Sequence, residues 1–126
     1  MNEKLPSFIE LPAFERMRET YLDDEAYQSL QVALIAEPKQ GDVITGTGGL
    51  RKTRFEDKRR NKGKRGGLRV IYYYQVSELE FLMFTIYSKD EMNDLTEKQK
   101  ALLKERLKQE LVERYPKHSN AATQED

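Results

Sequence analysis

The sequence predicts an α+β domain in which an antiparallel sheet is packed by helices, with the element order β-α-α-β-β-β-α. Two observations carry this prediction. Three β-type runs lie together in the middle of the chain, and apolar residues recur at helical spacing before and after them. The length of 126 residues fits one domain. We assign residues 1–115 to this domain and residues 116–126 to a polar C-terminal tail.

The N-terminal part predicts one short strand and two helices. Residues 8–11 have the composition of a strand, and Pro12 ends its pairing because proline lacks a backbone N–H. Residues 13–22 carry apolar side chains at helical spacing. A second helix follows, with Asp23 as its expected N-cap and Pro38 as its stop.

The rest of the chain predicts three strands and a long helix. The expected strands are residues 50–56, 68–76 and 81–89, and the last is apolar on both faces and therefore interior to the sheet. The connections at residues 39–49 and 57–67 contain several glycines, and we expect the second to be a mobile loop. Thr96 and Gln99 match a capping box that begins the last helix.

The net charge of zero hides a strong separation of charge along the chain. Residues 51–69 contain ten lysines or arginines and two acidic residues, which gives a local net charge of +8 and leaves −8 for the remainder. A field of this size favours a phosphate-rich partner. The three tyrosines at positions 72–74 follow directly and offer rings on which bases stack.

Residue counts exclude several kinds of site. There is no cysteine, and the one histidine, His118, lies in the polar tail, so a histidine-based catalytic pair and a His/Cys metal site are both excluded. We therefore expect no metal and no cofactor. No apolar run approaches the roughly 20 residues of a membrane span, and the N-terminus does not resemble a signal peptide. We expect a cytoplasmic protein that does not act at membranes.

Alternation along the strands gathers cations on one face. Lys52 and Arg54 share a face of one strand, while Arg69 opens the next strand on a face with Ile71 and Tyr73. In the last strand, alternation places together Phe81, Met83, Thr85, Tyr87 and Lys89. The expected catalytic group, at one end of the sheet, consists of Lys52, Arg54, Arg69, Tyr87 and Lys89.

Such a group can cleave RNA without histidine or metal. The 2′-hydroxyl loses a proton and attacks the adjacent phosphate, and nearby cations stabilise the negative charge that the pentacoordinate phosphate gains. The bond to the 5′-oxygen then breaks, and the 5′-oxygen leaves. Repulsion between neighbouring ammonium groups lowers a lysine pKa toward the range of a general base. Arginine remains charged and binds phosphate in a bidentate manner.

The remaining cations of this region are expected to bind RNA. This group consists of Arg51, Lys58, Arg59, Arg60, Lys62, Lys64 and Arg65, with Tyr73 as a stacking ring. Three alternatives stay open: a solvated charged face for the loop, a carboxylate partner for Arg69, and core packing for the tyrosines. The acids Asp90, Glu91 and Asp94 favour a role in connection and capping over a metal site.

Several short motifs together resemble the RelE/HigB family of bacterial toxins, most closely its HigB-like branch. They are GDVI at 41–44, GTGGLRK at 46–52, GKRGGLRVIYY at 63–73, TIYSKDE at 85–91 and DLT at 94–96. The resemblance covers roughly residues 8–112. Each motif alone has low specificity, whereas their combination is specific.

The resemblance implies the toxin of a type II toxin–antitoxin pair that enters the ribosomal A site and cleaves mRNA. It implies a cognate antitoxin, which we expect to be a helix-turn-helix protein of the HigA kind, and operator DNA binding only through the antitoxin complex. Lys52, Arg54 and Arg69 match basic positions of RelE-like members. Two family positions, an arginine and a stacking tyrosine, fall instead near Asp90 and Thr96.

Two other functions remain as alternatives. The first is a gyrase poison of the related ParE kind, which cleaves no RNA. The second is a nucleic-acid-binding module without catalytic activity. The dense basic residues on the expected catalytic face favour the nuclease.

Overall fold

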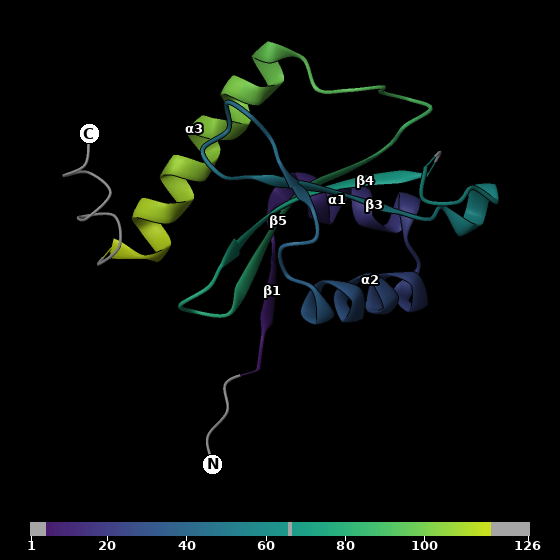
Figure 1. Cartoon of the computed structure of the whole chain (residues 1–126), viewed down its shortest axis with the longest axis horizontal. Helices are drawn as coiled ribbons and strands as arrows, with labels where there is room; N and C mark the ends of the chain where they lie inside the picture. The colour runs from purple at the N-terminus through teal and green to yellow at the C-terminus, as the bar shows by residue number, and fades with distance from the viewer. Residues whose placement is uncertain (1–4, 66, 117–126) are drawn as a thin grey trace.

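A five-stranded sheet forms the centre of the structure, a computed structural model that describes residues 5–65 and 67–116 (Figure 1). The strands are β1 (Ser7–Glu10), β2 (Asp42–Val43), β3 (Arg51–Phe55), β4 (Leu68–Gln75) and β5 (Glu80–Ser88). They lie side by side in the order β1-β5-β4-β3-β2. The helices are α1 (Pro12–Tyr21), α2 (Asp24–Ala36), the 3-10 helix η1 (Lys58–Arg60) and α3 (Glu97–Arg114).

The predicted α+β class is confirmed, with three differences in detail. Strand β1 pairs with β5 in parallel, whereas the other neighbouring strands are antiparallel. The two-residue strand β2 extends the far edge of the sheet. Helix η1 lies within the segment for which the sequence predicts a mobile loop. Asp57 caps η1, because its side chain accepts a hydrogen bond from the N–H of Arg60 at 3.3 Å.

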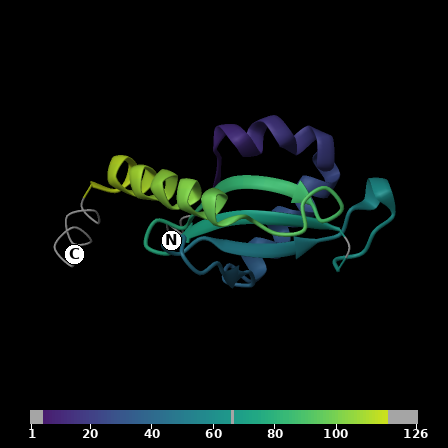
Figure 2. The same cartoon turned by 90° about the horizontal axis from the view of Figure 1, so that it is seen from above.

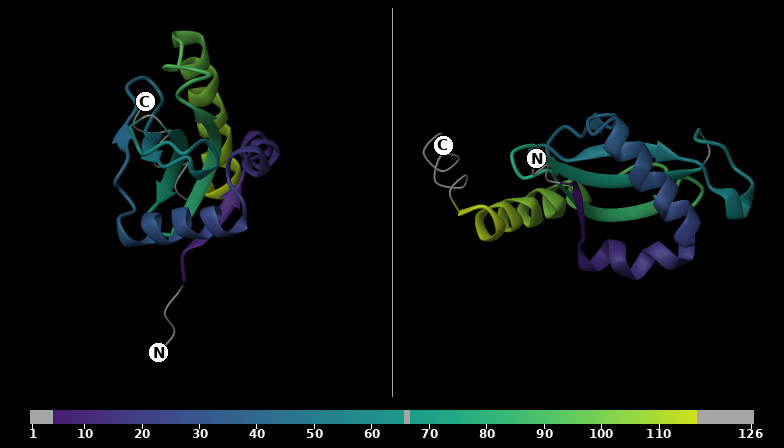
Figure 3. Two further views of the ribbon diagram at one scale, coloured as in Figure 1. Left: turned by 90° about the vertical axis from the view of Figure 1, so that its right-hand side faces the viewer. Right: turned by 90° about the horizontal axis from the view of Figure 1, so that it is seen from below.

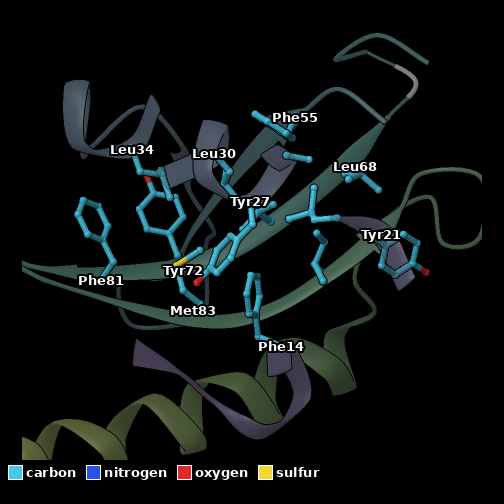
Figure 4. Packing of buried hydrophobic residues seen from close by; sticks show 14 residues of the cluster. Phe14, Tyr21, Tyr27, Leu30, Leu34, Phe55, Leu68, Tyr72, Phe81 and Met83 are labelled. Atoms are coloured by element: carbon cyan, nitrogen blue, oxygen red, sulfur yellow. The ribbon is translucent and has the colours of Figure 1, made fainter. Parts of the chain in front are cut away.

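Helices cover both faces of the sheet (Figure 2). On one face, α1 and α2 pack through residues such as Phe14, Leu30 and Leu34 against Tyr72 and Met83, as Figure 4 shows. On the other face, Leu107 of α3 belongs to a second apolar cluster, together with Leu50, Ile71, Leu82 and Phe84. Figure 2 shows that α3 extends beyond one end of the sheet, while η1 lies at the opposite end.

A β-bulge corrects the predicted face of part of β5. The register between β4 and β5 shifts between Ile71 and Tyr72, so that Ile71 lies opposite Thr85 and Tyr72 lies opposite Met83. One extra residue on a strand reverses the alternation beyond it. Met83 and Phe81 therefore pack under α1 and α2, and the prediction that they share the face of Tyr87 is wrong. Alternation holds in β3 and β4, because no bulge interrupts their pairing.

Two predicted helix starts are confirmed. The Asp23 side chain accepts a hydrogen bond from the N–H of Ala26 at 2.8 Å, and Thr96 and Gln99 form a capping box.

The end of α2 is held to the sheet by Tyr72, whose hydroxyl donates to the carbonyl of Pro38 at 2.7 Å and accepts from the N–H of Gly41 at 3.1 Å. The right-hand panel of Figure 3 shows α2 crossing this side of the sheet, with α1 alongside. No helix within residues 5–65 and 67–116 is long and apolar enough to cross a membrane.

Candidate catalytic site

Three side chains of the predicted group lie in one row across the sheet. Arg54 of β3 is the register partner of Arg69 of β4, which is in turn the partner of Tyr87 of β5. Lys52 lies two residues from Arg54 on the same strand, opposite Ile71. The sheet therefore brings Lys52, Arg54, Arg69 and Tyr87 together at the end that faces η1. We call these four residues, three cations and one tyrosine, the cation row.

Arg69 is buried and fixed by the backbone of the loop that precedes it. Its side chain is only 4% exposed, and its guanidinium donates to the carbonyls of Lys64 at 3.1 Å, Arg65 at 2.7 Å and Leu68 at 3.3 Å. No carboxylate in the described residues forms an ion pair with it, so the alternative of a carboxylate partner does not apply there. Burial, and then the charge of Arg54, lower the pKa of Arg69.

Arg54 is the exposed member of the row. It has no hydrogen bond or ion pair with any described residue, and it lies directly opposite the positive charge of Arg69. Residues opposite each other on antiparallel strands have Cβ atoms about 5 Å apart, and like charges in such a pair destabilise the sheet. An anion beside Arg54 would offset this repulsion.

Tyr87 contributes a buried hydroxyl without a partner. The residue is 6% exposed, and its hydroxyl forms no hydrogen bond within the described residues. Its pKa is raised by burial and by the charge of Asp94, while the charge of Arg69 acts in the opposite direction. The hydroxyl therefore remains protonated at neutral pH and is suited to donate a hydrogen bond rather than to accept a proton.

Lys52 forms an ion pair with Asp94, a residue of the connection between β5 and α3. The Nζ and Oδ1 atoms are 3.4 Å apart, and both side chains are partly exposed. The pKa of Asp94 is lowered, first by the hydrogen bond from the N–H of Leu95 and further by the charge of Lys52. The sequence predicts only a connecting or capping role for Asp94, and no local pattern indicates that it reaches a strand 42 residues away.

Lys89 lies at the same end of the sheet, one residue beyond β5. Its backbone N–H donates to the carbonyl of Gly67 at 3.0 Å, which joins the end of β5 to the start of β4. The side chain is partly buried and forms no ion pair with a described residue. It adds positive charge beside the row.

The basic loop between β3 and β4 is attached to the body of the protein. Arg59 donates to the carbonyls of Glu19 and Thr20 at the end of α1, at 2.6 and 2.8 Å. Arg60 donates to the hydroxyl of Ser88 at 2.9 Å and lies near the carboxylates of Asp57 and Glu91. Two further ion pairs among the described residues of this loop are Lys62–Asp90 at 3.3 Å and Lys58–Glu56 at 3.8 Å.

These contacts divide the predicted RNA-binding residues into two groups. Lys64 and Arg65 have exposed side chains without a carboxylate partner in the described part of the chain, so their charge is available to a ligand. The other cations of the loop are engaged with carboxylates, with a hydroxyl or with backbone carbonyls. The sequence shows how many cations the loop contains. It does not show that Asp90 and Glu91, which follow β5, lie close enough to neutralise two of them.

The last two predicted RNA-binding residues lie away from the loop. Arg51 donates to the carbonyls of Lys39 and Gly41, at 3.2 and 2.7 Å, and so holds the turn that follows α2. Tyr73 is partly buried against the α3-side cluster, close under Gly49. The structure places its ring in packing contacts, which is the alternative to base stacking.

No protein-family model matches the chain. Among solved structures, the chain is similar to a double arginine-to-alanine mutant of the E. coli toxin RelE in the free state, with a TM-score of 0.46 and 13% sequence identity. The match covers 70% of this chain and 87% of that chain. A likeness of this degree says nothing about chemistry, for which the cation row is the relevant feature.

Proposed function

We propose that this protein is the toxin of a type II toxin–antitoxin pair, of the RelE/HigB kind and closest to the HigB-like branch. Its activity is ribosome-dependent cleavage of mRNA in the A site, which inhibits translation. The observation that carries the proposal is the cation row itself. It combines an exposed arginine without a partner, a buried arginine opposite it and a buried tyrosine hydroxyl without a hydrogen bond, all within the described residues.

Each member of the row has a distinct part in the proposed reaction. Arg54 contacts the scissile phosphate and stabilises the charge of its pentacoordinate form. Arg69 supplies a second, fixed positive charge and holds the basic loop in place. Tyr87 donates a hydrogen bond to a phosphate oxygen once substrate binding uncovers its hydroxyl, which is buried in the free protein. Lys52, within the row, and Lys89, beside it, add positive charge, and the cleavage step needs no metal.

The ribosome supplies the orientation that the row alone lacks. Arg54 is the one fully exposed member of the row, while Arg69 and Tyr87 are buried, so the row alone does not enclose a substrate. Positioning of the 2′-hydroxyl in line with the leaving oxygen contributes much of the rate in reactions of this kind. Lys64 and Arg65, which project their charge beside the row, bind phosphates of ribosomal RNA. Naked RNA is therefore cleaved poorly.

The proposed partners follow from the proposed role. A cognate antitoxin, a helix-turn-helix protein of the HigA kind, neutralises the toxin in the cytoplasm. The toxin reaches operator DNA only within that complex. A small open reading frame next to the gene that encodes such a protein would support the pairing.

Primer extension on cellular mRNA after induction of the protein tests the proposal. Breaks at codon-associated positions are expected in cells that express the wild type, and their absence is expected with the Arg54→Ala variant at equal expression. Stalled gyrase–DNA complexes without mRNA breaks would instead indicate a gyrase poison. RNA binding without either effect would indicate a binding module.

A further inference from the structure

The ion pair between Lys52 and Asp94 places a negative charge in the cation row. Of the four candidate cations Lys52, Arg54, Arg69 and Lys89, only Lys52 has a carboxylate partner within residues 5–65 and 67–116. The partner comes from the connection that passes over this face between β5 and α3. The same carboxylate acts on Tyr87, whose pKa it raises.

The backbone of Asp94 is fixed, whereas its side chain is free to rotate. Its backbone is anchored, because the next residue, Leu95, is buried and Thr96 caps α3. Its side chain is 63% exposed, and among the described residues it is oriented by the N–H of Leu95, at 2.8 Å, and by Lys52. The carboxylate can therefore rotate into solvent without any loss of core packing.

A phosphate and the Asp94 carboxylate have the same chemistry toward this site. Both are anions that accept hydrogen bonds from an ammonium group, and the two anions repel each other. A phosphodiester bound to Arg54 would lie beside Lys52, because the two side chains share a face of β3 two residues apart, and the ion pair with Asp94 occupies the lysine.

We infer that Asp94 is a positioning residue that holds Lys52 in the free protein and competes with the substrate phosphate for it. This inference rests on the proposed function. Binding of the phosphate releases Asp94 to solvent and transfers the Lys52 contact to the ligand. Partly exposed ion pairs are weak, so the competition is of a size that a phosphate overcomes.

Titration with inorganic phosphate at constant ionic strength, followed by NMR of the backbone amides of β3 and β5, tests this inference without any cleavage assay. The variants are Asp94→Asn, Lys52→Ala and the double variant. Asparagine keeps an oxygen that accepts from the N–H of Leu95, so the fold is retained. Asp90→Asn is the matched control. It removes an equal charge from the same connection, but the carboxylate it removes pairs with Lys62 of the loop and not with Lys52.

We expect Asp94→Asn to tighten phosphate binding by roughly two- to fivefold, the range that a partly exposed ion pair supports. Asp90→Asn should have a smaller effect, and Asp94→Asn should have none in the Lys52→Ala background. Unchanged or weaker binding by Asp94→Asn would overturn the inference, as would an equal gain in the control or in the Lys52→Ala background. Absence of phosphate binding in both wild type and Asp94→Asn would also overturn it. A wild-type protein that binds phosphate in this way but cleaves no mRNA would leave the inference standing and defeat the proposed nuclease.

Discussion

At the scale of single residues, Arg54 and Arg69 show how the fold stores positive charge. The two guanidinium groups belong to directly opposite strand positions, an arrangement that costs about 0.2–1 kcal/mol for like charges. The arrangement persists because Arg69 is held by three carbonyls and Arg54 reaches solvent. A bound anion would offset the repulsion between the two groups.

Substitution of Arg54 should separate stability from activity. We expect Arg54→Ala to raise the free energy of unfolding by a few tenths to about 1 kcal/mol, because the repulsion with Arg69 disappears. Cleavage should fall by roughly 10- to 100-fold, the value of a charge-assisted hydrogen bond. Urea denaturation and growth after induction measure the two effects. Full toxicity of a stably folded Arg54→Ala protein would contradict the assignment.

Substitution of Tyr87 by phenylalanine should likewise raise stability and lower activity. A buried hydroxyl without a partner costs about 1–3 kcal/mol, so Tyr87→Phe should stabilise the protein, by about 1 kcal/mol, while lowering the rate of cleavage. Thermal and chemical denaturation test the first part, and single-turnover kinetics test the second. Loss of stability in Tyr87→Phe would show that the hydroxyl has a partner in solution. The high pKa of Tyr87 further predicts no change in its protonation between pH 6 and 9.

At the scale of elements, the sequence predicts more about the strands than about what joins them. The strands, the helix starts at Asp23 and Thr96, and the shared face of Lys52 and Arg54 follow from local patterns. The bulge in β5 does not, because alternation in a sequence contains no mark of an extra residue when both faces are apolar. The docking of the basic loop is also hidden, since Arg59 reaches backbone carbonyls 40 residues away.

Gly67 is the position where the basic loop depends most on a missing side chain. A Cβ atom there would lie 2.6 Å from the carbonyl oxygens of Phe55 and Gly63 and 3.0 Å from the nitrogen of Asp57. We expect Gly67→Ala to destabilise the protein by about 1–3 kcal/mol and to lower cleavage, because these backbone atoms position the loop carbonyls that hold Arg69. Chemical denaturation measures the first effect.

Gly63→Ala provides the control for this prediction. A Cβ atom at Gly63 meets nothing within 4 Å, so the substitution should change stability by less than about 0.5 kcal/mol. Equal stability of the two variants would argue against the close packing of the loop on the strand ends.

At the scale of the whole molecule, only part of the positive charge of residues 51–69 is available to a ligand. The local charge of +8 already counts Glu56 and Asp57, and it is reduced further by Asp90, Glu91 and Asp94, which pair with Lys62, Arg60 and Lys52. Arg51, Arg59 and Arg69 bind backbone carbonyls instead of carboxylates. Within the described residues, this leaves Arg54, Lys64 and Arg65 of the segment, and Lys89 beyond it, without a partner for their charge. The density of charge in the sequence therefore overstates the charge that a ligand meets. It nevertheless indicates the end of the sheet at which the row forms.

Removal of Lys64 and Arg65 together should change binding rather than chemistry. Removing one phosphate contact reduces the slope of log K against log salt by about 0.7–0.9, so the double alanine variant should bind ribosomes more weakly and with a slope reduced by roughly 1–2. Binding measured at several salt concentrations tests this, with Lys108→Ala on the outer face of α3 as the control. The rate of cleavage at saturating ribosome concentration should stay within a fewfold of wild type. An unchanged slope would show that these cations face solvent in the complex.

The most direct test of the central claim is single-turnover cleavage of one defined mRNA, free and bound to purified programmed ribosomes. The cation row predicts cuts within the A-site codon of the bound mRNA and little cleavage of the free mRNA, with the Arg54→Ala protein slower by roughly 10- to 100-fold on ribosomes. Equal cleavage of free and bound mRNA would contradict the dependence on the ribosome. No cleavage by the wild type, or full activity of Arg54→Ala, would contradict the assignment of the cation row as the site of chemistry.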